Sequence, residues 1–269
     1  MAVKGKTGPS LSIIIPAYNE ERRIGPTLDE ILSFIASQTY TSEVIVIDDG
    51  SEDGTSAIVC ERVHRYQLAG FALRVVRNEP NRGKGYSVKR GIEEAEGAIA
   101  LFTDADLSSP ITEAPKLLEP ITAGTADLVF GSRALRRDLI AVRQPRARDF
   151  AGRSFNLFVK LMTGLPFKDT QCGFKAFRRE ALLPVFRLMR VERFGFDPEM
   201  LYIARKFGLR LLEVPVVWNH SEGSKVRFVR DSSRMLLDLA TIRINHRLGY
   251  YDVHVPDDAE MLRRPSLSG

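Results

Sequence analysis

The sequence contains no long hydrophobic run. Its longest stretch without Asp, Glu, Lys or Arg is Thr7–Asn19, which has 13 residues and includes two prolines. A membrane-spanning helix needs about 20 consecutive apolar residues, so we expect no integral membrane segment. The segment Met1–Ser10 has two lysines but no apolar core after them, so we expect no secretory signal.

Cysteine and histidine are also scarce. The two cysteines, Cys60 and Cys172, exclude a disulfide framework and make a reducing, cytosolic setting the expected one. The four histidines do not have the spacing of zinc ligands. We therefore expect a cytoplasmic protein, and a peripheral contact with the cytoplasmic face of a membrane stays open.

What the sequence does contain is typical of a globular α/β protein, with 44% hydrophobic and 27% charged residues. Apolar, β-branched segments recur about every 30 residues with helix-like segments between them, which indicates βαβ units on a mostly parallel sheet. The expected strands are Leu11–Ala17, Val44–Asp48, Leu73–Arg77, Ala98–Thr103 and Leu128–Gly131. The expected helices are Pro26–Ser37, Thr55–Ala69, Lys84–Glu96 and Thr112–Ala123.

The pattern changes after Ser132 to a C-terminal, largely helical elaboration. One helix is expected to begin with Asp197 as N-cap and Pro198 at its first position, and to end before Gly208. The other elements expected here are a basic loop at Arg133–Arg148, a helix at Asp149–Met162, a turn and strand at Asp169–Phe177, a strand at Leu211–Trp218 and a helix at Asp231–Leu248.

We expect one domain over residues 11–251, divided into halves at 11–132 and 133–251. The ends, 1–10 and 252–269, are expected to be flexible.

A polar cluster follows each of the five strands of the first half. Ligands of an open parallel sheet bind beyond the carboxyl ends of its strands, so these clusters are expected to form one rim. They are Pro16–Glu20, Asp48–Thr55, Asn81–Gly85, Asp104–Asp106 and Gly131–Arg133.

Asp104 and Asp106 put two carboxylates close together at a strand end. They repel each other unless a cation neutralises them, and such hard oxygen ligands suit Mg²⁺ or Mn²⁺. The alternative is an ordinary turn in which Asp106 caps the next helix. The position favours the metal, which would neutralise a diphosphate as it leaves.

Other rim residues have both a functional and a structural interpretation. Asp48 and Asp49 could accept hydrogen bonds from a base or ribose, or could simply form the turn. Tyr18 could stack on a nucleobase, or lie at the edge of the protein. Asn81–Gly85 leads into a helix whose N-terminus would favour an anion, although it lacks the spacing of a P-loop.

Positive charge is concentrated in one region. The net charge is +5, but Arg133–Glu180 alone contains 12 Lys/Arg and 4 Asp/Glu residues. This excess suits an anionic partner such as phosphate or an acidic lipid surface, or is a solvated face. A nucleic-acid binder would need a basic patch interleaved with aromatic residues, and none is found.

Together these motifs resemble glycosyltransferase family 2, whose members have the GT-A fold. The resemblance continues into the second half and is similar to the polyprenyl-phosphate branch, that of the dolichyl-phosphate β-glucosyltransferases and mannose synthases. Its motifs there are Asp169–Lys175 (DTQCGFK), Phe196–Glu199 (FDPE), Glu213–Pro215 with Trp218, Gly223–Lys225 (GSK) and the Asp231–Arg243 helix.

The resemblance implies a role for individual residues. Those expected to hold the nucleotide sugar are Pro16, Tyr18, Glu20, Asp48, Asp49, Lys84 and Asp104. Those expected to hold Mg²⁺ or Mn²⁺ are Asp104 and Asp106. Those expected at the reacting groups are Asp106, Asp169, Gln171, Arg133 and Arg148. Those expected at the acceptor phosphate are Arg133, Arg148, Ser224 and Lys225.

The function implied is inverting transfer of a hexose, glucose from UDP-glucose, to a polyprenyl monophosphate. The alternatives are a GDP-mannose donor, a soluble acceptor and, more remotely, a non-catalytic protein that binds anions. Two amphipathic segments, Arg153–Leu165 and Val226–Leu248, either meet a membrane interface or pack on the core.

Overall fold

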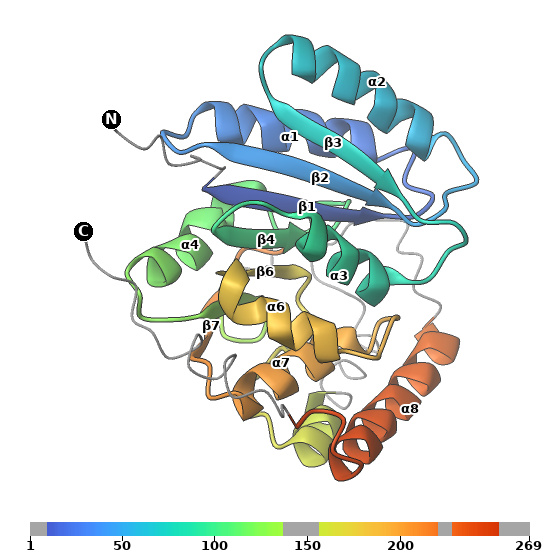
Figure 1. The fold of residues 1–269 in the computed structure, drawn as a ribbon, viewed down its shortest axis with the longest axis vertical. Helices are drawn as coiled ribbons and strands as arrows, with labels where there is room; N and C mark the ends of the chain where they lie inside the picture. Colours follow the sequence, from blue (N-terminus) through green and yellow to red (C-terminus); the bar gives the residue numbers. More distant parts are fainter. Residues whose placement is uncertain (1–9, 137–155, 220–227, 253–269) are drawn as a thin grey trace, which may run out of the picture.

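A seven-stranded sheet in the order β3-β2-β1-β4-β6-β5-β7 forms the centre of the computed structural model, which describes residues 10–136, 156–219 and 228–252 (Figure 1). Within these ranges β6 runs antiparallel to both of its neighbours, and the other pairs are parallel. The strands are β1 (Leu11–Ala17), β2 (Ser42–Asp48), β3 (Ala72–Arg77), β4 (Ile99–Thr103), β5 (Leu128–Ser132), β6 (Phe174–Arg178) and β7 (Leu211–Pro215). The predicted mostly parallel sheet is confirmed.

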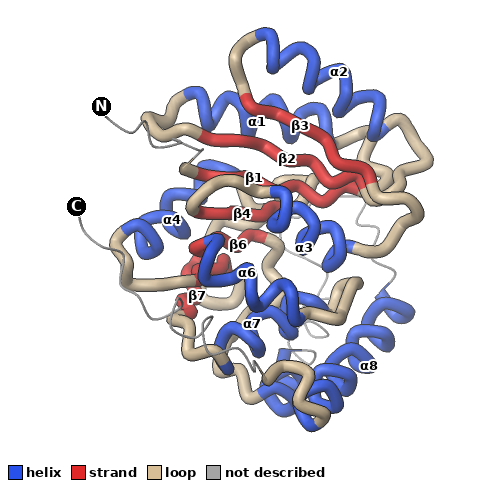
Figure 2. Tube along the Cα trace, in the orientation of Figure 1, coloured by secondary structure: helices blue, strands red, loops and turns tan. Residues whose placement is uncertain are grey.

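Helices cover both faces of the sheet (Figure 2). They are α1 (Ile24–Ala36), α2 (Thr55–Leu68), α3 (Lys84–Glu94), the short η1 (Ile111–Glu113), α4 (Ala114–Thr122), α6 (Arg179–Leu188), α7 (Phe196–Lys206) and α8 (Phe228–Arg247). Ile14 of β1 packs in the core beneath α3, α6 and α7, whereas Ile13 and Ile15 pack in the core beneath α1 and α4. Because both faces are covered, the strands are apolar throughout instead of alternating.

Two details of the second half differ from the sequence prediction. Asp197 is not an N-cap: Gly195 precedes the first residue of α7, and the Asp197 carboxylate lies 2.6 Å from the buried ammonium of Lys175. A fully buried ammonium needs a counter-ion, and this requirement overrides the capping preference. Helix α6 was not predicted from the sequence. It contains Pro184, and a proline argues against a helix interior because it cannot donate the backbone hydrogen bond there.

Several predicted features lie partly or wholly outside the described residues. Of the helix expected at Asp149–Met162, the structure describes helical residues 156–163. Most of the basic loop at Arg133–Arg148 and most residues of the two chain ends are not described. In the described ranges, no helix combines the length and the apolar character needed to cross a bilayer.

The sheet topology brings the polar rim together. Ala17 pairs with Asp48 at the last position of β1 and β2, and β4 runs parallel to β1, so Asp104 follows at the same edge. Because β5 is antiparallel to β6 and β6 is antiparallel to β4, Ser132 also ends at this edge. The carboxyl ends of β1, β2, β4 and β5 therefore lie at one edge of the sheet.

Candidate active site

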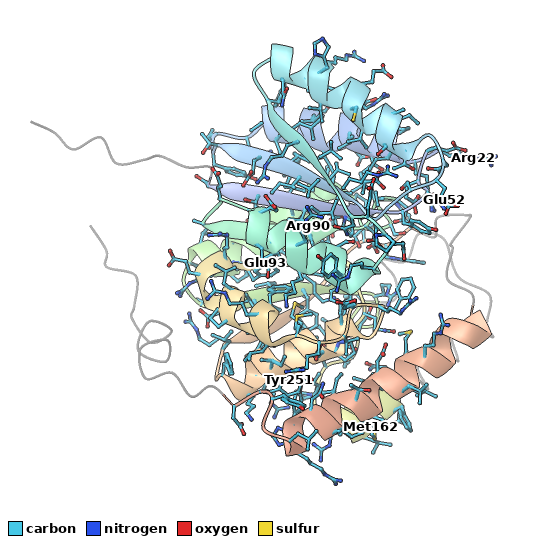
Figure 3. All side chains as sticks on the ribbon, turned by 45° about the vertical axis from the view of Figure 1, so that its right-hand side comes forward. Arg22, Glu52, Arg90, Glu93, Met162 and Tyr251 are labelled. Carbon is cyan, nitrogen blue, oxygen red and sulfur yellow. The ribbon has the colours of Figure 1, made fainter. Side chains whose placement is uncertain are left out.

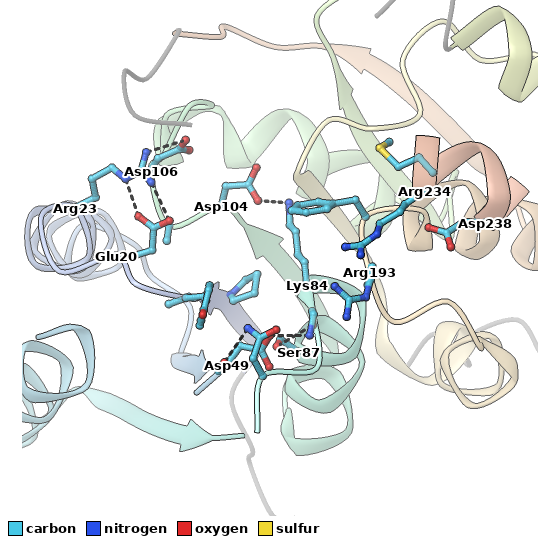
Figure 4. A pocket seen from close by; sticks show the side chains of 18 residues that line it. Glu20, Arg23, Asp49, Lys84, Ser87, Asp104, Asp106, Arg193, Arg234 and Asp238 are labelled. Carbon is cyan, nitrogen blue, oxygen red and sulfur yellow. Dashed lines mark hydrogen bonds and ion pairs between the residues drawn. The ribbon is translucent and has the colours of Figure 1, made fainter. Parts of the chain in front are cut away.

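A pocket of about 460 Å³ opens at the carboxyl ends of β1, β2 and β4 (Figure 4). One wall comes from the strand ends and the start of α3, and the opposite wall comes from α8 and the loop before α7. The lining residues are Pro16, Ala17, Tyr18, Glu20, Arg23, Asp49, Asn81, Gly83, Lys84, Ser87, Asp104, Ala105, Asp106, Arg193, Phe194, Arg234, Met235 and Asp238.

Asp49 shapes the floor of this pocket. Its carboxylate accepts hydrogen bonds from the side chain of Asn78 at 2.8 Å and from the backbone N–H groups of Arg82 at 3.1 Å and Gly83 at 2.7 Å. These bonds hold the loop that leads into α3. Asp49 therefore positions the glycine-rich turn, and a carboxylate still has acceptor capacity left for a ligand.

Lys84 lies near carboxylates from both halves of the chain, Asp104 and Asp106 from the first half and Asp197 from the second. Its ammonium forms an ion pair with Asp104. Burial disfavours the charged form of this side chain, but the nearby carboxylates of Asp104, Asp197 and Asp106 outweigh burial and raise the pKa of Lys84. The lysine is therefore charged at neutral pH and places a cation next to the first carboxylate of the pair.

The Asp104 and Asp106 carboxylates both line the pocket, as the strand-end position predicts. Asp106 accepts a hydrogen bond from the Ser108 backbone N–H at 3.0 Å, and Arg23 lies 3.9 Å from its other oxygen. Asp104 lies directly over Gly173, where an added Cβ would be 2.2 Å from its Oδ2. Residue 173 must lack a side chain for Asp104 to take this position.

The chemistry of the two carboxylates fits part of a metal site. Mg²⁺ and Mn²⁺ are commonly held by one or two carboxylates together with substrate phosphates, and both carboxylates carry cationic neighbours here, Lys84 and Arg23. The described residues contain no group of three or more His, Cys, Asp or Glu that could complete a protein-only site. The donor set fits a metal whose remaining ligands come from a nucleotide.

Arg133 and Asp169 form a two-pronged ion pair outside the lining of this pocket. Arg133 Nε and Nη2 lie 2.7 and 2.8 Å from the two Asp169 oxygens, and the Arg133 backbone N–H also donates at 3.0 Å. Burial by itself would raise the pKa of the Asp169 carboxyl, but Arg133 holds that pKa below its usual value. The pair fixes the segment after β5 to the Asp169–Lys175 segment.

Replacing Asp169 with asparagine is expected to lower the free energy of unfolding at pH 7 by about 2 kcal/mol, because partly exposed Arg133 loses its charged partner. The folded-state pKa of Asp169 is depressed, so the wild-type advantage is present above about pH 4 and disappears as the pH falls through the folded pKa. Urea unfolding of both proteins between pH 3 and pH 7 measures this. A difference that persists unchanged at pH 3 would contradict it.

The structure separates the predicted site residues into three groups. Those that line the pocket are Pro16, Tyr18, Glu20, Asp49, Lys84, Asp104 and Asp106. Those that are described but lie outside its lining are Asp48, Arg133, Asp169 and Gln171. Those that lie outside the described residues are Arg148, Ser224 and Lys225.

Asp48 takes a structural position. Its side chain is fully buried, and its carboxylate accepts hydrogen bonds from the Ser51 backbone N–H at 2.9 Å, from Arg77 at 2.9 Å and from the Ser56 hydroxyl. Of the two readings that the sequence allowed for Asp48, the geometry favours the turn-forming one.

Sequence reasoning missed part of the opposite wall. Arg193 and Phe194 had no assigned role, although only Gly195 separates them from the Phe196–Glu199 motif, which was the available signal. Arg234 and Met235 were read only as part of an amphipathic helix. Their place in the pocket depends on how α8 packs, which no local pattern specifies.

Comparison with known proteins gives consistent results. The glycosyl transferase family 2 profile matches residues 12–186. A dolichyl-phosphate beta-glucosyltransferase of Dictyostelium discoideum is 34% identical over 253 residues, covering 90% of this chain and 76% of that protein. The Homo sapiens protein of the same name is 36% identical over 251 residues, covering 89% and 76%.

Among solved structures, glucosyl-3-phosphoglycerate synthase from Mycobacterium tuberculosis has a similar fold. In complex with Mn²⁺, UDP and glucosyl-3-phosphoglycerate it superposes with a TM-score of 0.62 at 22% identity, covering 91% of this chain and 81% of that one. The same enzyme with Mn²⁺, UDP-glucose and phosphoglyceric acid gives 0.62 at 20% identity, covering 93% and 82%. At this identity the likeness shows the fold.

Proposed function

This chain belongs to glycosyl transferase family 2 and is a glycosyltransferase with the GT-A fold, and on that premise we propose that it transfers glucose from UDP-glucose to a polyprenyl monophosphate. The observation that carries the proposal is the extent of the match to dolichyl-phosphate beta-glucosyltransferases, about nine-tenths of this chain at 34–36% identity. The pocket supports it, because carboxylates and cations converge there at the strand ends.

Roles for the lining residues follow from their positions. We assign Tyr18, Glu20 and Asp49 to the nucleoside and Lys84 to the diphosphate; all four line the pocket, and Lys84 supplies a cation there. Asp104 and Asp106 would hold Mg²⁺ or Mn²⁺, which supplies charge neutralisation for the departing diphosphate.

The acceptor phosphate needs little activation. The second pKa of a phosphate monoester is about 6, so its oxygen is ionised at pH 7 and no general base is required. The work left to the protein is to hold the two substrates in line and to stabilise charge on the leaving group. Attack from the face opposite the nucleotide inverts the anomeric carbon and gives a β-linked product from an α-linked donor.

Nucleotide release tests the proposal. With Mn²⁺ present, UDP release from UDP-glucose is expected to depend on a short polyprenyl phosphate, and GDP release from GDP-mannose is expected to stay at background. Release from GDP-mannose instead would keep the mechanism and change the sugar. Release from UDP-glucose without any effect of the lipid would favour a soluble acceptor and contradict the polyprenyl assignment.

We also propose that α8 and residues 156–163 contact a membrane surface. Figure 3 shows Met162 and the end of α8 near Tyr251 on the same side of the molecule. Large aliphatic side chains that are more than half exposed gather on these two helices and at the residue after α8: Leu157, Leu161, Leu237, Ile244 and Leu248. Leu237, Ile244 and Leu248 recur at helical spacing, whereas Leu239 and Ile242 on the other face are buried in the core.

Flotation measures this contact. The wild-type chain is expected to float with vesicles of phosphatidylcholine and phosphatidylglycerol, and the double substitution Leu237→Glu/Ile244→Glu is expected to lower the bound fraction about tenfold, since each charge must be removed from an apolar interface. Leu212→Glu, at an exposed leucine of β7, is the matched control. Equal flotation of all three proteins would refute the contact.

A further inference from the structure

The pocket has two chemically different walls (Figure 4). The wall at the strand ends presents the carboxylates of Asp104 and Asp106. The wall across the pocket presents two guanidinium groups, Arg193 from the loop before α7 and Arg234 from α8. These two arginines come from the half of the chain that follows the nucleotide-binding motifs.

The two arginines differ from the other cations of the pocket. Arg23 forms a two-pronged ion pair with Glu20, and Lys84 pairs with Asp104. Among the residues that the structure describes, no carboxylate lies within ion-pair distance of the Arg193 or Arg234 guanidinium. Within the described residues, the Asp238 carboxylate compensates their positive charges only in part, as a nearby charge, and both arginines line the pocket.

The carboxylate of Asp238 does not use up this charge. It lies against Gly195, whose backbone N–H donates to it, and an added Cβ at Gly195 would be 2.5 Å from Asp238 Oδ2. Arg193 and Arg234 act on Asp238 only as nearby charges. Asp238 fixes the loop to α8, and within the described part of the chain it forms no ion pair or hydrogen bond with either guanidinium group.

The backbone that carries Arg193 is held firmly. Glu199 accepts hydrogen bonds from the backbone N–H groups of Arg190 at 3.1 Å and Val191 at 2.8 Å. From α3, the Tyr86 backbone N–H donates to the Glu192 carbonyl at 3.0 Å. Gly83 packs closely against the same carbonyl, since an added Cβ there would be 2.6 Å from it. Little backbone entropy is then left to lose when Arg193 binds a ligand.

We propose that Arg193 and Arg234 together bind the phosphate of the acceptor. This assignment rests on the proposed function. Guanidinium groups bind phosphate oxygens through paired hydrogen bonds. An acceptor that inverts the anomeric carbon must approach from the side opposite the diphosphate, and the arginine wall lies across the pocket from Asp104 and Asp106.

The surroundings of the pair also suit an acceptor with a hydrocarbon chain. Met235 lines the pocket beside Arg234, and the same turn of α8 carries two exposed leucines, Leu236 and Leu237. Arg133 was first expected at the acceptor phosphate. Two of its guanidinium nitrogens already donate hydrogen bonds to Asp169.

The step balances in atoms and charge. A lone pair of one phosphate oxygen forms the new bond to the anomeric carbon as the bond from that carbon to the β-phosphate oxygen of UDP breaks. The electron pair leaves with UDP, and no proton has to move. The acceptor loses one negative charge and becomes a diester, while the leaving diphosphate gains one.

The test compares Arg193→Ala and Arg234→Ala with Arg247→Ala, an exposed arginine at the far end of the same helix α8. With citronellyl phosphate as a short acceptor, each of the first two substitutions is expected to raise the acceptor KM at least about tenfold. The dissociation constant of UDP, measured with Mn²⁺ by calorimetry, is expected to stay within about twofold. Arg247→Ala is expected to change neither value.

An unchanged acceptor KM, or a loss of UDP affinity as large as the change in KM, would overturn the assignment; the second result would place the pair on the donor diphosphate. If the wild-type chain transfers no sugar to any polyprenyl phosphate, the proposed function fails, but the anion site can still be tested on its own. Binding of inorganic phosphate to Arg193 and Arg234 is then measured. Saturable phosphate binding to the protein loaded with UDP and Mn²⁺, lost in Arg193→Ala but kept in Arg247→Ala, would support an anion site. No binding by the wild type would overturn it.

Discussion

Replacing Asp106 with asparagine is expected to lower kcat about a thousandfold. The Asp106 carboxylate lines the pocket after β4 and, with Asp104, is one of the two side chains proposed to hold the metal. An amide keeps the size and one acceptor oxygen, so the hydrogen bond from the Ser108 backbone N–H can persist. The change removes the negative charge, and a catalytic metal is worth several kcal/mol of transition-state stabilisation.

The measurement is the steady-state rate of UDP release over a range of Mn²⁺ concentrations, together with UDP binding with and without Mn²⁺. The variant is expected to lose the increase in UDP affinity that Mn²⁺ confers, while its unfolding midpoint in urea stays close to wild type. Asp29→Asn, at a carboxylate on α1 outside the pocket lining, is the matched control. Wild-type turnover by the Asp106 variant would remove the metal assignment.

Replacing Lys175 with methionine is expected to lower the free energy of unfolding by about 3–5 kcal/mol. Lys175 is fully buried in β6, and its ammonium lies 2.6 Å from Asp197 and 2.5 Å from the Cys172 carbonyl oxygen. Methionine fills a similar volume but leaves the Asp197 carboxylate without its closest counter-ion. Removing one partner of a buried ion pair leaves an uncompensated charge, which gives the penalty its size.

A second substitution separates the lost charge from the lost packing. Adding Asp197→Asn to Lys175→Met removes the orphaned negative charge and is expected to recover at least about half of the lost stability. Urea unfolding of the wild type, both single variants and the double variant gives the coupling between the two residues. Losses that simply add would show that the pair contributes through packing alone.

The pH dependence gives a further check on the same pair. Burial raises the pKa of Asp197 despite the opposing effect of Lys175, and removing the lysine removes that opposition. The folded Lys175→Met protein then binds a proton at Asp197 more tightly than the unfolded chain and than the wild type, so its stability deficit relative to wild type is expected to shrink as the pH falls toward about 4. A deficit that grows as the pH falls would contradict this.

The fold and one wall of the site could be predicted from local sequence. The strands of the first half are continuous apolar segments of β-branched residues, and burial on both faces forces that composition wherever the strand lies in the sheet. Because parallel strands end at one edge, Tyr18, Asp49, Lys84, Asp104 and Asp106 had to meet there, and the structure places all five in one pocket.

The sequence also specified the chemistry of the second half without its geometry. The motif around Asp169 was recognised, but its partner was not, since Arg133 lies 36 residues away and their two-pronged contact depends on how β5 and β6 pair. Asp197 was read as a helix cap because capping is a local preference. The burial of Lys175 in β6 decided otherwise, and burial is a property of the whole fold.

Tertiary structure alone decided the second wall of the pocket. Nothing in the local pattern distinguishes Arg193 and Arg234 from the many solvated arginines of this basic chain, because an arginine becomes a binding group through what it faces and not through its neighbours in sequence. The packing of α8 against the core through Leu239 and Ile242, and the contact of Asp238 with Gly195, bring the two guanidinium groups to one pocket. Sequence determined which elements form and which edge of the sheet carries the polar rim, whereas long-range packing determined which charged side chains face the pocket from the opposite wall.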